Sequence, residues 1–175
     1  MKTYDELIEI ARKHRETLVL SIRKAHEASL RSENPEDRCS VIAINRQDGS
    51  LTDAVIDSDQ QPDNWFVLAA YPHINPIEAV VLYADEKAAI LNNWCLEQGA
   101  APPDQDDEEG DVPYLRRLVS WIENHMGTTA GEVLTDLARE QLITDFDPVS
   151  ELDDALQSLR DLSNGIVRAE PSDDE

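Results

Sequence analysis

Apolar residues near the N-terminus recur at the spacing of a helix. They follow one another at intervals of three, four or seven residues and would form one face: Leu7, Ala11, Leu18, Ile22, Ala25 and Ala28. Thr3 and Glu6 have the spacing of a capping box, in which each side chain hydrogen-bonds the backbone amide of the other residue. The pattern therefore predicts a single amphipathic helix over residues 4–30.

Three short runs after this helix are rich in apolar and β-branched residues, as is typical of strands. They cover residues 39–45, 50–56 and 65–71. Asp48 and Gly49 lie between the first two runs and favour a tight turn, so these two runs form a predicted hairpin. The economical arrangement is a small antiparallel sheet that packs on the long helix.

Residues 75–99 carry the signals of a second helix. Asn75 is suited to the N-cap position, Pro76 to the first helical position, and Gly99 to the end of the helix. Within this stretch, residues 80–83 form a short apolar run. Periodicity alone does not separate a helix from a fourth strand over so short a run, so both alternatives stay open there.

Residues 100–111 combine two prolines and a glycine with six carboxylates, namely Asp104, Asp106, Asp107, Glu108, Glu109 and Asp111. Repulsion among these carboxylates favours an extended chain, so we interpret the segment as an acidic linker. The chain is then predicted to be α+β, with a helix–sheet–helix domain over residues 1–99 before the linker and a three-helix module over residues 112–168 after it.

The three-helix module is predicted from helix patterns at residues 113–126, 130–141 and 149–162. The last of these contains the sequence LDDALQSLRDL, and GIVRAE follows it with a predicted short strand at Ile166 and Val167. Three helices followed by such a strand resemble a winged-helix module, over about a third of the chain. The final segment, residues 169–175, is an acidic tail expected to be disordered.

In DNA-binding winged-helix proteins the third helix enters the major groove with a basic and polar outer face. Here the apolar stripe of that helix is Val149, Leu152, Leu156 and Leu159, so carboxylates occupy the outer face. These carboxylates would face phosphates of like charge. The resemblance therefore implies a fold without direct binding to nucleic acid.

The net charge of −22 is distributed unevenly along the chain. Residues 1–99 contain 10 Lys and Arg against 17 Asp and Glu, whereas residues 100–175 contain 5 against 20. Two predicted C-terminal helices carry outward carboxylates that we interpret as partner-binding residues: Glu132, Asp136, Glu140, Glu151, Asp154 and Asp161. A strongly acidic surface repels nucleic acid and membranes and attracts basic surfaces. The expected partner is a basic protein.

Catalytic, metal-binding and cofactor-binding motifs do not stand out in the sequence. Cys39 and Cys95 are far apart and lack the spacing of a zinc site, and the four histidines lack a second ligand at metal-binding spacing. The six glycines do not form a phosphate-binding loop. The first twenty residues carry charges throughout and do not resemble a signal peptide, so a cytoplasmic location is expected.

Two hypotheses for function follow. The first is a non-enzymatic acidic binding protein that inhibits or modulates a basic partner, such as a nuclease, another nucleic-acid enzyme or a toxin, and that imitates nucleic acid. The alternative is a small enzyme or ligand-binding module in residues 1–99, with the acidity as a solvated face or an adaptation to a salty cytoplasm.

Overall fold

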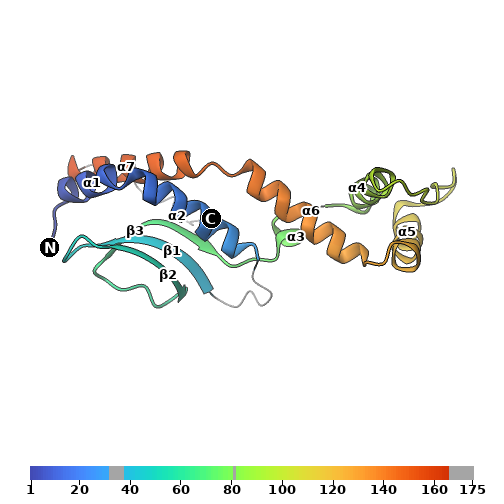
Figure 1. Cartoon of the computed structure of the whole chain (residues 1–175), viewed down its shortest axis with the longest axis horizontal. Coiled ribbons are helices and arrows are strands. Elements are labelled where there is room, and N and C mark those ends of the chain that lie inside the picture. The colour runs from blue at the N-terminus through green and yellow to red at the C-terminus, as the bar shows by residue number, and fades with distance from the viewer. Residues whose placement is uncertain (32–37, 81, 166–175) are drawn as a thin grey trace, which may run out of the picture. The chain divides into compact units, whose positions relative to one another are not determined.

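The computed structural model describes residues 1–31, 38–80 and 82–165. The protein is α+β, as predicted. Its contacts divide the chain into unit 1, which is Met1–Ile74 with Phe146–Glu175, and unit 2, which is Asn75–Asp145. Unit 1 is therefore discontinuous in sequence, because the chain leaves it for unit 2 and later returns. Figure 1 shows the elements of both units.

The sheet of unit 1 has three antiparallel strands in the order β2-β1-β3. These are β1 (Arg38–Asn45), β2 (Leu51–Asp57) and β3 (Trp65–Pro72), which confirms the predicted hairpin and third strand. The central strand β1 is almost entirely buried. Its register with β3 shifts between Ile42 and Ala43, which marks an irregularity in the pairing.

The turn between β1 and β2 requires glycine at position 49. Gly49 has a φ of 77°, in the left-handed region that favours glycine. A Cβ atom at this position would also lie 2.7 Å from Cε of Lys2 and 2.9 Å from Cδ1 of Ile10. The backbone conformation therefore explains the residue, since the two nearby atoms are the ends of flexible side chains that can move.

The predicted helix over residues 4–30 consists of two helices, α1 (Tyr4–Lys13) and α2 (Arg15–Ser29). The prediction was wrong at His14, where φ and ψ are −107° and 24° and depart from helical values. The apolar spacing continues across this break, so the hydrophobic pattern did not reveal it. The predicted stripe is otherwise buried, except for Ala28, which is exposed. The capping box of Thr3 and Glu6 is confirmed.

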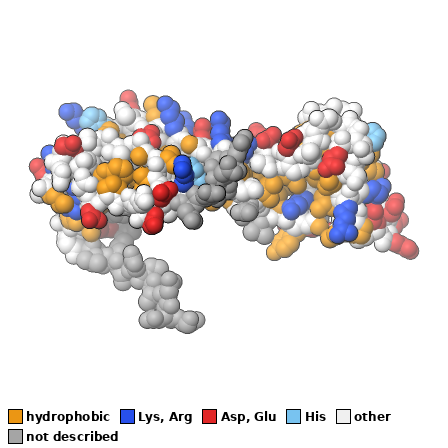
Figure 2. Space-filling model, turned by 90° about the horizontal axis from the view of Figure 1, so that it is seen from below, with side chains coloured by type: hydrophobic (Ala, Val, Ile, Leu, Met, Phe, Trp, Pro, Cys, Tyr) orange, Lys and Arg blue, Asp and Glu red, His pale blue; other side chains and the backbone are white. Residues whose placement is uncertain are grey.

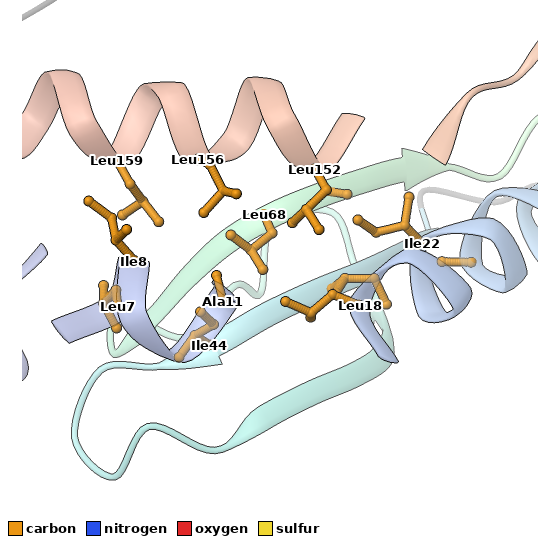
Figure 3. Packing of buried hydrophobic residues seen from close by; sticks show 13 residues of the cluster. Leu7, Ile8, Ala11, Leu18, Ile22, Ile44, Leu68, Leu152, Leu156 and Leu159 are labelled. Atoms are coloured by element: carbon orange, nitrogen blue, oxygen red, sulfur yellow. The ribbon is translucent and has the colours of Figure 1, made fainter. Parts of the chain in front are cut away.

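The last helix, α7 (Pro148–Ser163), also belongs to unit 1. Figure 1 shows α1, α2 and α7 on the same side of the sheet. Figure 3 shows side chains of α7 pointing toward those of α1, α2 and β3. The buried members of this core are Leu7, Ile8, Ala11, Leu18, Ile22, Ala25, Ile42, Ile44, Leu68, Ala69, Leu152, Leu156 and Leu159.

This packing differs from the predicted three-helix module over residues 112–168, and the winged-helix-like arrangement is not confirmed. The leucine stripe of α7 is buried as predicted, but against α1, α2 and the sheet. Val149 was wrongly placed in that stripe, since it is 41% exposed. The predicted strand at 166–167 and the tail at 169–175 lie outside the described residues.

Unit 2 contains α3 (Pro76–Ala79), α4 (Ala84–Glu97), α5 (Asp111–His125) and α6 (Ala130–Asp145). Its core is formed by Ala88, Leu91, Cys95, Tyr114, Leu118, Ile122, Ala130, Val133 and Leu134. The predicted helix over residues 75–99 is interrupted after α3, where Val80 has an extended backbone. Asn75 caps α3 by accepting a hydrogen bond from the amide of Ile77, as its position in the sequence suggested.

The acidic segment 100–111 lies within unit 2, between α4 and α5, and does not join the two units. The predicted linker is therefore not confirmed. Among the described residues, none of the helices is both long and apolar enough to cross a membrane.

Candidate functional site

The six predicted partner-binding carboxylates fall into two sets in two different units. Glu132, Asp136 and Glu140 lie on α6 in unit 2, whereas the other three lie on α7 in unit 1: Glu151, Asp154 and Asp161. Each set follows one helix. The predicted single surface required α6 and α7 to pack in one module, but the contacts within the chain assign these two helices to different units.

Two residues of the α6 set line a groove in unit 2. The groove has a volume of about 560 Å³ and is lined by Ile77, Thr128, Thr129, Gly131, Glu132, Thr135, Asp136 and Arg139. It lies beside the start of α6 and is reached by one residue of α3. Its lining includes three threonine hydroxyls, two carboxylates and one guanidinium, so it offers several polar contacts beside an apolar surface.

Local hydrogen bonds hold Glu132 at the start of α6. Its carboxylate accepts a hydrogen bond of 2.8 Å from the Thr128 hydroxyl, and its amide donates one of 3.1 Å to the Thr129 hydroxyl. The second bond makes Thr129 the N-cap of α6, which begins at Ala130. Glu132 is therefore oriented before any partner binds, which reduces the entropy that binding would cost.

Asp136 lies one helical turn further along α6 and forms an ion pair with Arg139, at 2.9 Å between oxygen and nitrogen. The Asp136 side chain is 74% exposed, whereas that of Arg139 is 27% exposed. An ion pair this exposed on the carboxylate side contributes little to stability. The Asp136 carboxylate therefore stays available to a cation in solvent, and the lining as a whole carries one excess negative charge.

The carboxylates of α7 have other surroundings. Glu151 accepts a hydrogen bond of 3.2 Å from the Tyr71 hydroxyl, which ties α7 to β3. Asp161 accepts one of 3.0 Å from Gln157 on the same helix. Asp154 is exposed, as is Glu140 on α6. Glu151 has a structural role that the sequence did not suggest, because Tyr71 lies 80 residues away in the chain.

Residues 104–109 form an acidic loop that Arg117 of α5 holds in place. The Arg117 guanidinium donates to the Glu109 carboxylate at 2.8 and 3.1 Å and to the carbonyl of Asp104 at 2.6 Å. Hydrogen bonding to Arg117 also lowers the pKa of Glu109. Tyr114 donates a further hydrogen bond of 3.0 Å to the carbonyl of Pro103. The loop is thus bound to α5, and Figure 2 shows a group of carboxylates on the surface of unit 2.

The net charge of the chain is divided equally between the two units. Unit 1 contains 11 Lys and Arg against 22 Asp and Glu, and unit 2 contains 4 against 15, so each unit has a net charge of −11. Unit 2 reaches this value with fewer residues and very few cations. Unit 2 therefore carries more negative charge per residue than unit 1 does.

Ser40 and His73 form a pair that the sequence did not reveal. The Ser40 hydroxyl lies 2.8 Å from Nε2 of His73, which is the geometry of a nucleophile and its base. Burial and the nearby Arg38 lower the pKa of His73, which therefore stays neutral near pH 7. Ser40 is only 2% exposed, however, and a substrate would have to reach it. The signal that could have found the pair is the alignment of β1 and β3, which places Ser40 opposite Tyr71.

The two cysteines have surroundings that disfavour nucleophilic chemistry. Cys39 and Cys95 are free and buried, and burial raises the pKa of both thiols, which disfavours the reactive thiolate. Among residues 1–31, 38–80 and 82–165, three or more His, Cys, Asp or Glu side chains do not come together in an arrangement that could hold a metal ion.

No protein-family model matches the chain, and no curated protein or solved structure is significantly similar to it.

Proposed function

We propose that the protein is a non-enzymatic acidic binding protein that modulates a basic partner, and that the groove beside α6 receives a basic side chain of that partner. The observation that carries the proposal is the position of Glu132 and Asp136 in one groove. A class of basic partner that fits is a nucleic-acid enzyme or a toxin whose cationic surface normally faces phosphates.

The electrostatics of unit 2 support this proposal. With 15 Asp and Glu against 4 Lys and Arg, unit 2 attracts cations before contact and speeds the encounter with a basic surface. Once a guanidinium or ammonium group enters the groove, Glu132 and Asp136 provide carboxylate acceptors, and the threonine hydroxyls provide neutral ones. Charge-assisted hydrogen bonds of this kind are the stronger ones in proteins.

The experiment is a calorimetric titration of the full chain with an oligoarginine peptide across a salt series. The test variant is Glu132→Gln with Asp136→Asn. The matched control is Glu97→Gln with Glu123→Gln, which removes the same charge from exposed positions of unit 2 outside the groove. We expect the test variant to lose about tenfold in affinity, or about 1.4 kcal/mol. The control should lose much less.

Equal losses in the two variants would show that only overall charge attracts the peptide, and this would contradict the groove as a site. A flat salt dependence in the wild type would contradict the electrostatic proposal as a whole, since attraction between exposed charges is screened by salt.

The alternative function is a small hydrolase in unit 1, and the Ser40–His73 pair is the observation that favours it. A serine-directed fluorophosphonate probe tests it on the full chain. Labelling that disappears in Ser40→Ala would support an enzyme, whereas an unlabelled wild-type chain would contradict it.

A further inference from the structure

His26 lies in an aromatic cluster at the point where the chain returns to unit 1. Its ring stacks on Phe146, with centroids 3.7 Å apart and planes 6° from parallel. Tyr71 of β3 packs edge-on against both rings, at 5.3 and 5.5 Å. Phe146 is the first residue of the returning segment, two positions before α7. The cluster therefore attaches the start of α7 to α2 and β3.

The cluster accommodates a neutral imidazole better than a charged one. Nδ1 of His26 is buried and has no hydrogen-bond partner among the described residues. A neutral ring can leave that nitrogen without a proton, whereas an imidazolium carries a proton on both nitrogens and needs an acceptor for each. A buried donor without an acceptor is costly.

Charged groups on the packed elements act in the opposite direction. Glu151 of α7 and Glu27 of α2 both favour the imidazolium, and β3 contributes the neutral Tyr71 hydroxyl, which donates to Glu151. Burial is the larger effect, and it lowers the pKa of His26. Proximity of Glu151 also raises the pKa of Tyr71, after burial as the main cause, so this phenol stays protonated.

We propose that protonation of His26 releases the start of α7 from α2 and β3, so that mild acid loosens the segment that completes unit 1. When α7 leaves, the imidazole is hydrated and gains a proton more easily. Release therefore takes up a proton at pH values below the ordinary histidine pKa of about 6.5. The attachment is strongest above that value and weakens as the pH falls. This inference does not depend on the proposed function.

Hydrogen exchange of the full chain, corrected for the intrinsic effect of pH, tests the proposal between about pH 7.5 and about pH 5.5, the range in which histidine titrates. In the wild type, we expect protection of α7 amides to fall with pH while protection of α5 stays constant. The fall cannot exceed about tenfold per pH unit, because a single proton is involved.

His26→Phe keeps a flat ring against Phe146 but cannot titrate, so its α7 protection should not change with pH. His26→Gln serves the same purpose if the first variant does not fold. The matched control is His125→Gln, which alters an exposed histidine on α5 of unit 2 and should keep the wild-type response. Constant α7 protection in the wild type would overturn the proposal. An undiminished acid response in the His26 variant would also overturn it.

Discussion

Leu156→Ala tests whether α7 belongs to the core of unit 1. Leu156 is 2% exposed, and Figure 3 shows it beside Leu68 of β3 and between Leu152 and Leu159. The substitution removes three buried carbons, worth about 2.4 kcal/mol at about 0.8 kcal/mol each. The cavity left behind raises the expected loss to about 3–5 kcal/mol. In a unit of about a hundred residues, this corresponds to a drop in Tm of about 10 °C or more.

The assay must separate the two units, because a chain with two cores need not unfold in one step. Hydrogen exchange in a urea series provides this separation through peptides from β1 and β3 on one side and from α5 on the other. We expect Leu156→Ala to weaken protection of β1 and β3 and to leave α5 unchanged.

Two controls accompany this variant. Leu118→Ala removes an equally buried leucine of unit 2 and should produce the reverse pattern, with a loss in α5 and none in the sheet. Val149→Ala changes an exposed residue of α7 and should have little effect. If Leu156→Ala instead weakened α5 and α6 and spared the sheet, α7 would pack with the helices of unit 2, and the division into units would be refuted.

Three further predictions concern local contacts. Arg117→Ala should make the acidic loop at 104–109 the first site of limited proteolysis, whereas Arg116→Ala, which alters an exposed neighbour, should leave the digestion pattern unchanged. The pKa of Glu109 is lowered, so its ion pair with Arg117 stabilises the loop at pH values above the ordinary glutamate pKa of about 4.3 and is lost as the pH falls through the lowered value. Protection of the loop should decrease over that range of pH, and Glu109→Gln should abolish the decrease. Thr3→Ala removes one half of the capping box and should lower the free energy of unfolding by about 0.5–2 kcal/mol, measured by urea denaturation, with Thr17→Ala on α2 as an exposed control.

Local signals predicted much of the secondary structure. The capping box at Thr3, the glycine turn at Gly49 and the three apolar runs depend on residues close in sequence, and all appear where they were expected. The three leucines of the apolar stripe of α7 were also predicted correctly, since they reflect the helical period, whereas Val149 is exposed. Such signals describe which face of an element is buried but not which element covers it.

For that reason, the main error in the prediction was the surface against which α7 packs. Leu152, Leu156 and Leu159 suit any apolar surface, and proximity in sequence favoured α5 and α6, whereas the actual surface comes from residues 1–74. The acidic segment 100–111 was interpreted as a linker because carboxylates repel one another, but Arg117 offsets that repulsion from a position eight residues beyond Glu109. Of the predicted site, Glu132 and Asp136 share a groove, and the α7 carboxylates lie in the other unit.

The most direct test of the proposed function is a chemical-shift titration of the full, isotope-labelled chain with the oligoarginine peptide. The proposal predicts that the largest amide shifts fall on the groove beside α6, at Ile77, Gly131, Glu132 and Asp136, and that salt reduces them together. An oligoglutamate peptide of equal length should leave these amides unshifted. Shifts spread evenly over the carboxylates of both units, or concentrated on Asp154 and Asp161 of α7, would contradict the account.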